Sequence, residues 1–431
     1  MPGKLLKSQI IPLLSVVILG LSGGGIHILI GRYYDIEVLG QFNSTLAFYL
    51  VFAQVGSLGT YMAILHLFSK PLDDIQADIA WGILATAILL ALTGSICIIL
   101  IIFILNSYLP GIWAGDQVTA EMILAASLGI PFFCVNKILL AFLNAQNHIN
   151  SYFSLQAIRY VLLLTVLFGL ASLNASPVLL GHVFWICEGI LLLMCLTLVY
   201  IYAGRYLLPA MLSNPSGFSV NQGNVAVHSI QALFGGTIQE LAVRVDIFIL
   251  TYLVEPVQVG LYSVAAMVAE GLNQVTGIVR DQLSPQIGRL FAEKRNGELS
   301  GLFRKTLIYG YGSLLLPALL AVLIFPAISE WLFSNPYIRL AGLPFTILMA
   351  GLYLSSPYHF LFYAPNQMGR PLVLTWIVAI STVLNIILNI LLIPNWGISG
   401  SACATSLSWI AAALILLWWL KRTNTQSRMG I

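Results

Sequence analysis

The chain has 431 residues, of which 59% are hydrophobic and only 8% charged, and its formal net charge is +3. An ordinary soluble domain carries roughly 25% charged residues, so a soluble globule of this size would lack the polar surface to cover its apolar mass. The composition therefore indicates an integral membrane protein, and the small net charge argues against a nucleic-acid partner. The five cysteines lie in apolar runs without metal-like spacing, and neither a metal site nor a cofactor is predicted.

Apolar runs divide the chain into about twelve predicted transmembrane helices, because crossing the hydrocarbon core takes about 20 residues. In the first half they lie near residues 8–30, 38–67, 79–105, 118–143, 152–171 and 178–203. In the second half they lie near residues 225–254, 258–283, 304–328, 338–363, 371–393 and 397–420. Turn-forming residues such as Pro110-Gly111 separate the runs. The first, second and seventh runs are more polar than the rest. The sequence thus predicts an all-α multi-pass fold.

Basic residues are distributed unevenly between the predicted loops. Thirteen of them fall on one side of the membrane: Lys4, Lys7, Lys70, Arg205, Arg289, Lys294, Arg295, Arg304, Lys305, Arg370, Lys421, Arg422 and Arg428. Only Arg32 and Arg339 fall on the other side. Because cytoplasmic loops are enriched in Lys and Arg, both termini are predicted to lie in the cytoplasm.

A weak internal repeat relates the two halves. Val38–Phe42 and Gln258–Tyr262 each open the second helix of their half and lie 220 positions apart, as do Gln54 and Gln274. A shift across six helices lets both halves enter the membrane from the same side, which predicts a parallel repeat. We expect two six-helix bundles, residues 1–203 and 225–420, around a central cavity. A cytoplasmic linker over residues 204–224 would join them, and residues 421–431 would form a cytoplasmic tail.

Polar residues form a stripe on the eighth span. Ionisable side chains at membrane depth cost free energy unless they are paired or face water, so each is a candidate functional residue. At 100° per residue, seven positions fall within an arc of about 120°: Glu270, Asn273, Gln274, Gly277, Arg280, Asp281 and Ser284. The stripe is expected to face the bundle interior or a wet cavity. The alternative is a structural polar seam, with Arg280 and Asp281 at the cytoplasmic interface.

The seventh span carries a second set of ionisable residues. Glu240 and Arg244 have the i, i+4 spacing of a structural ion pair. Asp246 lies deep in the span without an obvious partner nearby in the sequence, and is the better candidate for a proton- or ion-linked carboxylate.

In the first half, Lys137, Arg159 and Glu188 lie in the fourth, fifth and sixth spans. A buried Lys or Arg in a transporter cavity suits an anionic substrate. For Arg159 the alternative is that its side chain reaches the cytoplasmic headgroups. The sequence contains no Walker motif, nucleophile elbow or His-Glu-x-x-His pattern, so the protein is predicted not to be an enzyme. Any uphill transport would then draw on an ion gradient or on the membrane potential.

Four segments of the second half resemble polysaccharide flippases of the Wzx type, the PST family of the MOP exporter superfamily. They are residues 244–250 (RVDIFIL), 259–265 (VGLYSVA), 284–290 (SPQIGRL) and 385–402 (NIILNILLIPNWGISGSA). The number of spans, the parallel halves and the short outer loops agree with this family along the whole chain. The first half matches it more loosely.

The resemblance implies a flippase of the bacterial cytoplasmic (inner) membrane that moves undecaprenyl-diphosphate-linked oligosaccharide by alternating access, as in lipopolysaccharide O-antigen assembly. The implied substrate contacts are Lys137, Arg159, Asn273, Gln274 and Arg280. The implied ion-coupling carboxylates are Glu188, Asp246 and Glu270. The expected partners are membrane lipid, the lipid-linked oligosaccharide, a coupling proton or sodium ion, and other membrane proteins of polysaccharide assembly.

Several other classes of membrane protein compete with this interpretation. A MATE-type multidrug or cation antiporter shares the fold, although acidic residues would be expected in its cavity. A lipid II flippase of the MurJ type usually has two further helices. A major facilitator carries its basic signature between helices two and three, where this chain has Asp73, Asp74 and Asp78. A membrane polysaccharide polymerase or ligase would need a large outer loop, and none is predicted.

Overall fold

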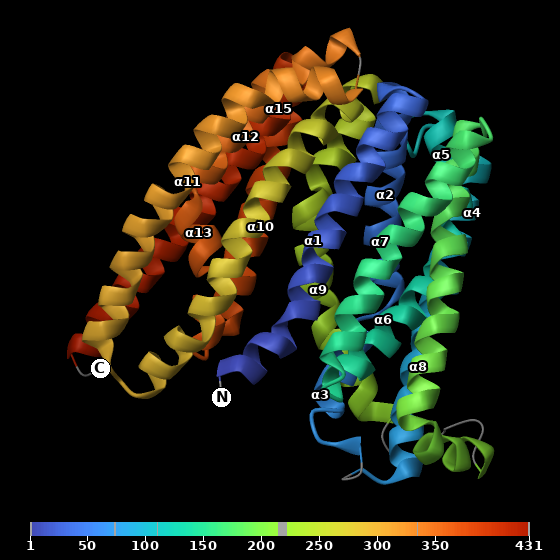
Figure 1. The fold of residues 1–431 in the computed structure, drawn as a ribbon, viewed down its shortest axis with the longest axis vertical. Coiled ribbons are helices and arrows are strands. Elements are labelled where there is room, and N and C mark those ends of the chain that lie inside the picture. The colour runs from blue at the N-terminus through green and yellow to red at the C-terminus, as the bar shows by residue number, and fades with distance from the viewer. Residues whose placement is uncertain (1, 73–74, 110, 214–221, 334, 430–431) are drawn as a thin grey trace. The chain divides into compact units, whose positions relative to one another are not determined.

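The computed structural model describes residues 2–72, 75–109, 111–213, 222–333 and 335–429. Every regular element within these ranges is a helix (Figure 1). The helices pack into two compact units, Met1–Glu240 and Leu241–Ile431. The division falls inside helix α9 (Gln222–Leu253), which therefore contributes residues to both units.

The first unit holds the elements coloured blue to green in Figure 1. In chain order they are α1 (Pro2–Tyr33), α2 (Ile36–Gly56), α3 (Thr60–Leu67), α4 (Ala77–Tyr108), α5 (Gln117–Ser127), α6 (Ile130–Ala145), α7 (Ile149–Ser172), the 3-10 helix η2 (Pro177–His182) and α8 (Val183–Ser213). Helix α1 packs along α7, and α6 contacts α3, α4 and α8. Helix α6 is thus surrounded by other helices of its unit, and most of its side chains are buried.

Acidic caps fix where two helices of the first unit begin. The Asp35 carboxylate accepts a hydrogen bond from the Val38 amide at 2.8 Å, and the Asp116 carboxylate accepts one from the Thr119 amide at 2.9 Å. Each bond satisfies an amide that has no partner within its own helix. The Gln41 side chain also donates to Asp116 at 3.3 Å, which ties the start of α5 to α2.

The second predicted span, residues 38–67, is broken, so the expectation of one continuous helix was wrong. Leu58 and Gly59 have φ values of +49° and +72° between α2 and α3. Residues with a side chain rarely adopt such values. A Cβ added to Gly59 would also collide with the backbone of Ser229 and Leu233 on α9. The break therefore allows α9 to pack directly against the chain at this point, which hydropathy alone does not reveal.

The second unit contains the C-terminal part of α9 followed by seven further elements. These are α10 (Pro256–Ala292), α11 (Asn296–Phe333), η3 (Pro336–Ala341), α12 (Gly342–Leu354), α13 (Ser356–Leu361), α14 (Ala364–Gln367) and α15 (Pro371–Met429). Gly397 has φ 53° and ψ −135°, which is not helical and divides α15 into two segments. They correspond to the predicted spans 371–393 and 397–420.

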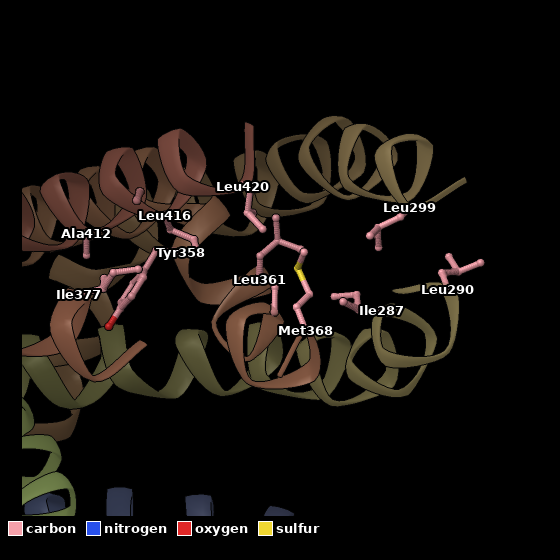
Figure 2. Packing of buried hydrophobic residues seen from close by; sticks show 12 residues of the cluster. Ile287, Leu290, Leu299, Tyr358, Leu361, Met368, Ile377, Ala412, Leu416 and Leu420 are labelled. Atoms are coloured by element: carbon pink, nitrogen blue, oxygen red, sulfur yellow. The ribbon is translucent and has the colours of Figure 1, made fainter. Parts of the chain in front are cut away.

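Apolar side chains hold one end of the second unit together (Figure 2). They come from α10, α11, α13, the end of α14 and both segments of α15: Ile287, Leu290, Leu299, Tyr358, Leu361, Met368, Ile377, Leu416 and Leu420. The short helices α13 and α14 thus supply Leu361 and Met368 to a core that the long helices surround.

Eight helices in the described ranges are long and apolar enough to cross a membrane, or nine if the pair α5 and α6, bent by 49°, forms one span. The stretch Pro371–Thr423 of α15 counts once among them, and α9 and α10 are not included. Each of the twelve predicted spans nevertheless coincides with a helix or a broken helix. The all-helical multi-pass fold is confirmed, whereas the number of crossings and the orientation of the termini stay predictions.

Helix starts in the two halves recur at nearly the spacing of the predicted repeat. The residues before α2 and α10 are Asp35 and Glu255, which lie 220 positions apart (255 minus 35). The left-handed residues before α7 and α15 are Asn147 and Gly369, which lie 222 positions apart (369 minus 147). Helix α8 continues to Ser213, inside the predicted linker, and residues 214–221 of that linker lie outside the described residues. The predicted domain boundaries and the parallel relation of the halves stay predictions.

Candidate functional site

The first unit brings polar, charged and aromatic side chains from five helices together. We call this group the first-unit cluster, and it consists of Gln54 on α2, Tyr61 on α3, Phe133, Asn136 and Lys137 on α6, Arg159 on α7 and Glu188 on α8. Three of its members are the charged residues predicted from the first half of the sequence.

Lys137 lies beside an amide acceptor and two aromatic rings. Its ammonium donates a hydrogen bond to the Gln54 side-chain oxygen and lies 4.1 Å from the centroid of the Tyr61 ring. The Phe133 centroid is 5.7 Å away. Glu240 on α9 lies within electrostatic range of both Lys137 and Tyr61. The distances to Tyr61 and Phe133 lie in the cation–π range, and such contacts stabilise an ammonium away from bulk water.

Arg159 forms a buried ion pair on the other side of the cluster. Its Nε lies 2.8 Å from one Glu188 carboxylate oxygen, and its Nη2 donates to the other at 3.3 Å. Nη1 donates to the Gln156 side chain at 3.2 Å, and the guanidinium carbon lies 4.9 Å from the Phe133 centroid. The side chains of Arg159 and Glu188 are 12% and 5% exposed. The pair is thus almost fully withdrawn from solvent.

Asn136 holds the Glu188 carboxylate independently of Arg159. Its side-chain nitrogen donates to Glu188 Oε2 at 2.7 Å and to the Glu188 backbone oxygen at 2.9 Å. Asn136 itself is fully buried. Because a buried amide is costly unless it is hydrogen-bonded, these two bonds fix α6 against α8 at this depth.

The cluster places two cations against one aromatic ring. Phe133 lies within cation–π distance of both Lys137 and Arg159, and Arg159 is also paired with the Glu188 carboxylate. Rings, amides and two basic side chains form a site suited to the negatively charged group of a larger ligand.

The second unit contains a separate chain of buried hydrogen bonds, which we call the second-unit chain. The Tyr262 hydroxyl donates to the Asp246 carboxylate at 2.5 Å and lies 3.5 Å from the Thr405 hydroxyl. Asn385 donates to the same Thr405 oxygen at 3.2 Å. Asn389 donates to the Asn385 side-chain oxygen at 2.7 Å. Asp246, expected as an ion-linked carboxylate, therefore belongs to an oxygen-rich group that joins α9, α10 and both segments of α15.

The seven residues of the polar stripe on α10 differ in exposure. Glu270, Gln274 and Asp281 are exposed, while Gly277 and Ser284 are buried. Asn273 is half-buried, and the Thr276 hydroxyl lies 2.7 Å from its backbone oxygen and 2.8 Å from its side-chain oxygen.

Arg280, on the same stripe, contacts aromatic rings of its own unit. Its guanidinium carbon lies 4.9 Å from the Tyr363 centroid and 5.8 Å from the Phe362 centroid. Its Nε lies 3.3 Å from the exposed Asp281 carboxylate. The structure thus gives Arg280 partners from the break between α13 and α14 that the sequence did not indicate.

The structure brings together some predicted residues and adds others. Arg159 and Glu188 form an ion pair, and both Lys137 and Arg159 lie within cation–π distance of Phe133. Tyr61, Asn136, Tyr262 and Thr405 were not predicted, and Gln54 was noted only for its repeat spacing. The sequence feature that could have indicated some of these residues is the presence of side-chain amides inside apolar runs, such as Asn136 beside Lys137. The assigned roles of all these residues, and the pairing of Glu240 with Arg244, stay predictions.

Comparison with known proteins identifies the fold. A protein-family model described as lipid II flippase MurJ matches residues 340–430. An uncharacterized membrane protein of Methanocaldococcus jannaschii is 32% identical over 127 residues, which are 28% of this chain and 25% of that protein. The chain therefore matches about a quarter of the length of this curated relative.

Solved structures of transporters match almost the whole chain. A lipid II flippase MurJ in an inward closed conformation has a TM-score of 0.74 at 16% identity, over 96% of this chain and 87% of that one. An inward-facing multidrug resistance MATE family transporter of the MOP superfamily has a TM-score of 0.78 at 13% identity, over 95% of each chain. A MOP superfamily transporter from Pyrococcus furiosus, described as having a binding pocket of reverse polarity, has a TM-score of 0.62 at 11% identity, over 97% and 94%. The protein thus has the MATE- and MurJ-like fold of MOP superfamily transporters, as predicted.

Proposed function

We propose that this protein is an alternating-access flippase. Its cargo would be an oligosaccharide attached by diphosphate to undecaprenol, carried from the inner to the outer leaflet of the bacterial cytoplasmic membrane. The lipid tail would remain in the bilayer while the sugar and diphosphate pass through the protein. Lys137 and Arg159 would contact the anionic diphosphate, with Arg280, Asn273 and Gln274 as further polar contacts.

The observation that carries this proposal is the pair of cations on Phe133 in the first-unit cluster. Burying a Lys and an Arg at membrane depth is costly, and the cost is offset when a ligand supplies negative charge. A diphosphate is a strong acceptor for both groups: guanidinium binds it through parallel hydrogen bonds and ammonium acts as a point charge. The reverse polarity described for the binding pocket of the similar transporter from Pyrococcus furiosus offers a parallel within the same fold.

The similarity to MATE and MurJ structures supports transport rather than enzymatic chemistry. The second-unit chain supports coupling to an ion. The Asp246 carboxylate accepts a hydrogen bond from the Tyr262 hydroxyl, which connects it through Thr405 to Asn385. Carboxylate, hydroxyl and amide oxygens are the ligands that hard cations prefer. Asp246 would bind the coupling proton or sodium ion, with Glu270 as an exposed second candidate.

Two other cargoes are each favoured by one observation. The MurJ family model over residues 340–430 favours a lipid II-type precursor. The TM-score of 0.78 against a MATE transporter favours a multidrug or cation antiporter. The first alternative shares the diphosphate chemistry of the first-unit cluster. The second would require a cationic ligand to bind beside Lys137 and Arg159, which is electrostatically unfavourable.

Deleting the gene is expected to cause lipid-linked oligosaccharide to accumulate on the cytoplasmic side and surface polysaccharide to disappear. The measurement is extraction of labelled polyprenyl-diphosphate glycans, compared with a strain carrying the gene on a plasmid. Accumulation of a peptidoglycan precursor instead would indicate the lipid II-type cargo. Unchanged glycan pools together with increased sensitivity to cationic drugs would contradict the flippase proposal and indicate the antiporter.

A further inference from the structure

The Arg159–Glu188 pair differs from an ordinary structural ion pair in how each partner is held. The guanidinium also contacts Gln156 and the face of Phe133, both of which are independent of Glu188. The Glu188 carboxylate also accepts a hydrogen bond from the Asn136 side chain, which donates a second bond to the Glu188 backbone oxygen, and neither bond involves Arg159. Each side chain would therefore keep its position if the contact between them were broken.

We propose that Glu188 is the resting counter-ion of Arg159, and that a phosphate-bearing anion displaces its carboxylate from the guanidinium. The inference rests on the proposed function in taking the first-unit cluster as the anion site. It adds a specificity-determining role for Glu188, whose carboxylate pairs with Arg159 and competes with the cargo for the guanidinium.

A free-energy argument supports an exchange rather than simple binding. An uncompensated cation in a low-dielectric interior is strongly destabilised, so Arg159 needs a negative partner at all times. In this structure Glu188 supplies it at 2.8 Å. An incoming anion can supply it instead, because guanidinium presents paired donors that match carboxylate and phosphate alike. The Arg159 guanidinium can thus pair either with Glu188 or with the cargo. The cargo must replace the electrostatic interaction that is lost when the Glu188 carboxylate is displaced.

The exchange also predicts which anions succeed. A displaced Glu188 carboxylate stays close to the site, since Asn136 holds it, and it repels the incoming anion. A singly charged anion gains little more than the carboxylate it replaces. A diphosphate carries more charge and can also contact Lys137, which lies within cation–π distance of the same Phe133 ring as Arg159. Competition from the Glu188 carboxylate therefore favours multiply charged phosphate groups over singly charged anions.

The test measures inorganic pyrophosphate binding to the purified full-length protein in neutral detergent at a fixed pH of 8, by calorimetry. Glu188→Gln keeps the shape and an acceptor for Asn136 but removes the competing charge, and it is expected to bind pyrophosphate at least tenfold more tightly than the wild type. Arg159→Gln is expected to bind pyrophosphate no more tightly than the wild type. The double variant Arg159→Gln/Glu188→Gln is expected to lose the gain in affinity seen in Glu188→Gln. Glu330→Gln, which removes the charge from an exposed pair with Arg339, is the matched control and is expected to bind like the wild type.

A second measurement, the melting temperature with and without pyrophosphate, applies even if Glu188→Gln folds poorly. Ligand binding to the native state raises the melting temperature, so pyrophosphate is expected to stabilise Glu188→Gln far more than the wild type, and to leave the double variant unchanged. Nanodiscs with and without phosphatidylglycerol separate a free phosphate group from a bilayer lipid headgroup as the source of the anion. Stabilisation of Glu188→Gln by pyrophosphate in both kinds of nanodisc supports the exchange. Stabilisation by phosphatidylglycerol alone, whose headgroup carries one negative charge, would contradict the preference for multiply charged phosphate groups.

Unchanged or weaker pyrophosphate affinity in Glu188→Gln, with no stabilisation by pyrophosphate or phosphatidylglycerol, would overturn the inference. This outcome is distinct from failure of the proposed function. A protein that exports no lipid-linked glycan can still show the affinity gain in Glu188→Gln, and a working flippase can lack it.

Discussion

Replacing Lys137 with methionine is expected to lower the rate of cargo translocation about ten- to hundredfold. The substitution keeps an unbranched side chain that is one atom shorter, but it removes the cation that contacts Gln54 and lies over the Tyr61 ring. A hydrogen bond to a charged group contributes about 1.5–3 kcal/mol, and every 1.4 kcal/mol or so is a factor of about ten. The measurement is the initial rate of export of labelled lipid-linked oligosaccharide. Lys137→Arg, which keeps the charge, should retain most of the rate.

Two controls separate lost cargo contact from lost folding. Removing the ammonium leaves Glu240, which lies within its electrostatic range, with less compensation. The double variant Lys137→Met/Glu240→Gln removes that imbalance, and we expect it to stay inactive although it folds normally. Arg339→Gln removes an exposed cation paired with Glu330 and should export at the wild-type rate. Recovery of export in the double variant would show that Lys137 serves folding rather than cargo.

Asp246→Asn is expected to abolish the response of transport to an imposed cation gradient. The substitution preserves the shape of the side chain and an acceptor for the Tyr262 hydroxyl, but it removes the negative charge in the second-unit chain. A neutral amide attracts a cation far more weakly than a carboxylate does. In proteoliposomes, a sodium or proton gradient should accelerate transport by the wild type. Transport by Asp246→Asn should be slow and insensitive to both gradients.

Tyr262→Phe is the matched control for Asp246. It removes the hydroxyl that donates to the carboxylate at 2.5 Å and leaves the charge in place. We expect this variant to respond to the gradient with an altered cation concentration dependence. If Asp246→Asn responds to sodium and proton gradients as the wild type does, Asp246 is not the coupling carboxylate.

The helical segments could be predicted from sequence because a 20-residue apolar run has few alternatives in a bilayer. The breaks inside those segments could not. Hydropathy does not report backbone dihedrals, so the left-handed residues Leu58 and Gly59 were hidden inside an apolar run. Near Gly397 the prediction succeeded because Pro394-Asn395 marks a turn, although the structure places the non-helical residue two positions further on.

The candidate site was predicted in its residue types but not in its contacts. Lys137, Arg159 and Glu188 stood out because ionisable side chains are rare at membrane depth. Their arrangement depends on how α6, α7 and α8 face one another, which a single sequence does not specify. Arg159 and Glu188 are 29 positions apart and pair only through helix packing. Asn136 went unnoticed because a neutral amide in an apolar run carries no charge signal, although its hydrogen bonds orient Glu188.

The most direct test of the proposed function is flipping of a fluorescent undecaprenyl-diphosphate oligosaccharide in proteoliposomes that contain only this protein. A membrane-impermeant quencher added outside reports which leaflet holds the label. The proposal predicts that wild-type protein makes nearly all of the label accessible within minutes, while Lys137→Met liposomes resemble protein-free ones. Equal accessibility in wild-type, Lys137→Met and protein-free liposomes, with correctly folded protein in each preparation that contains it, would contradict the proposal.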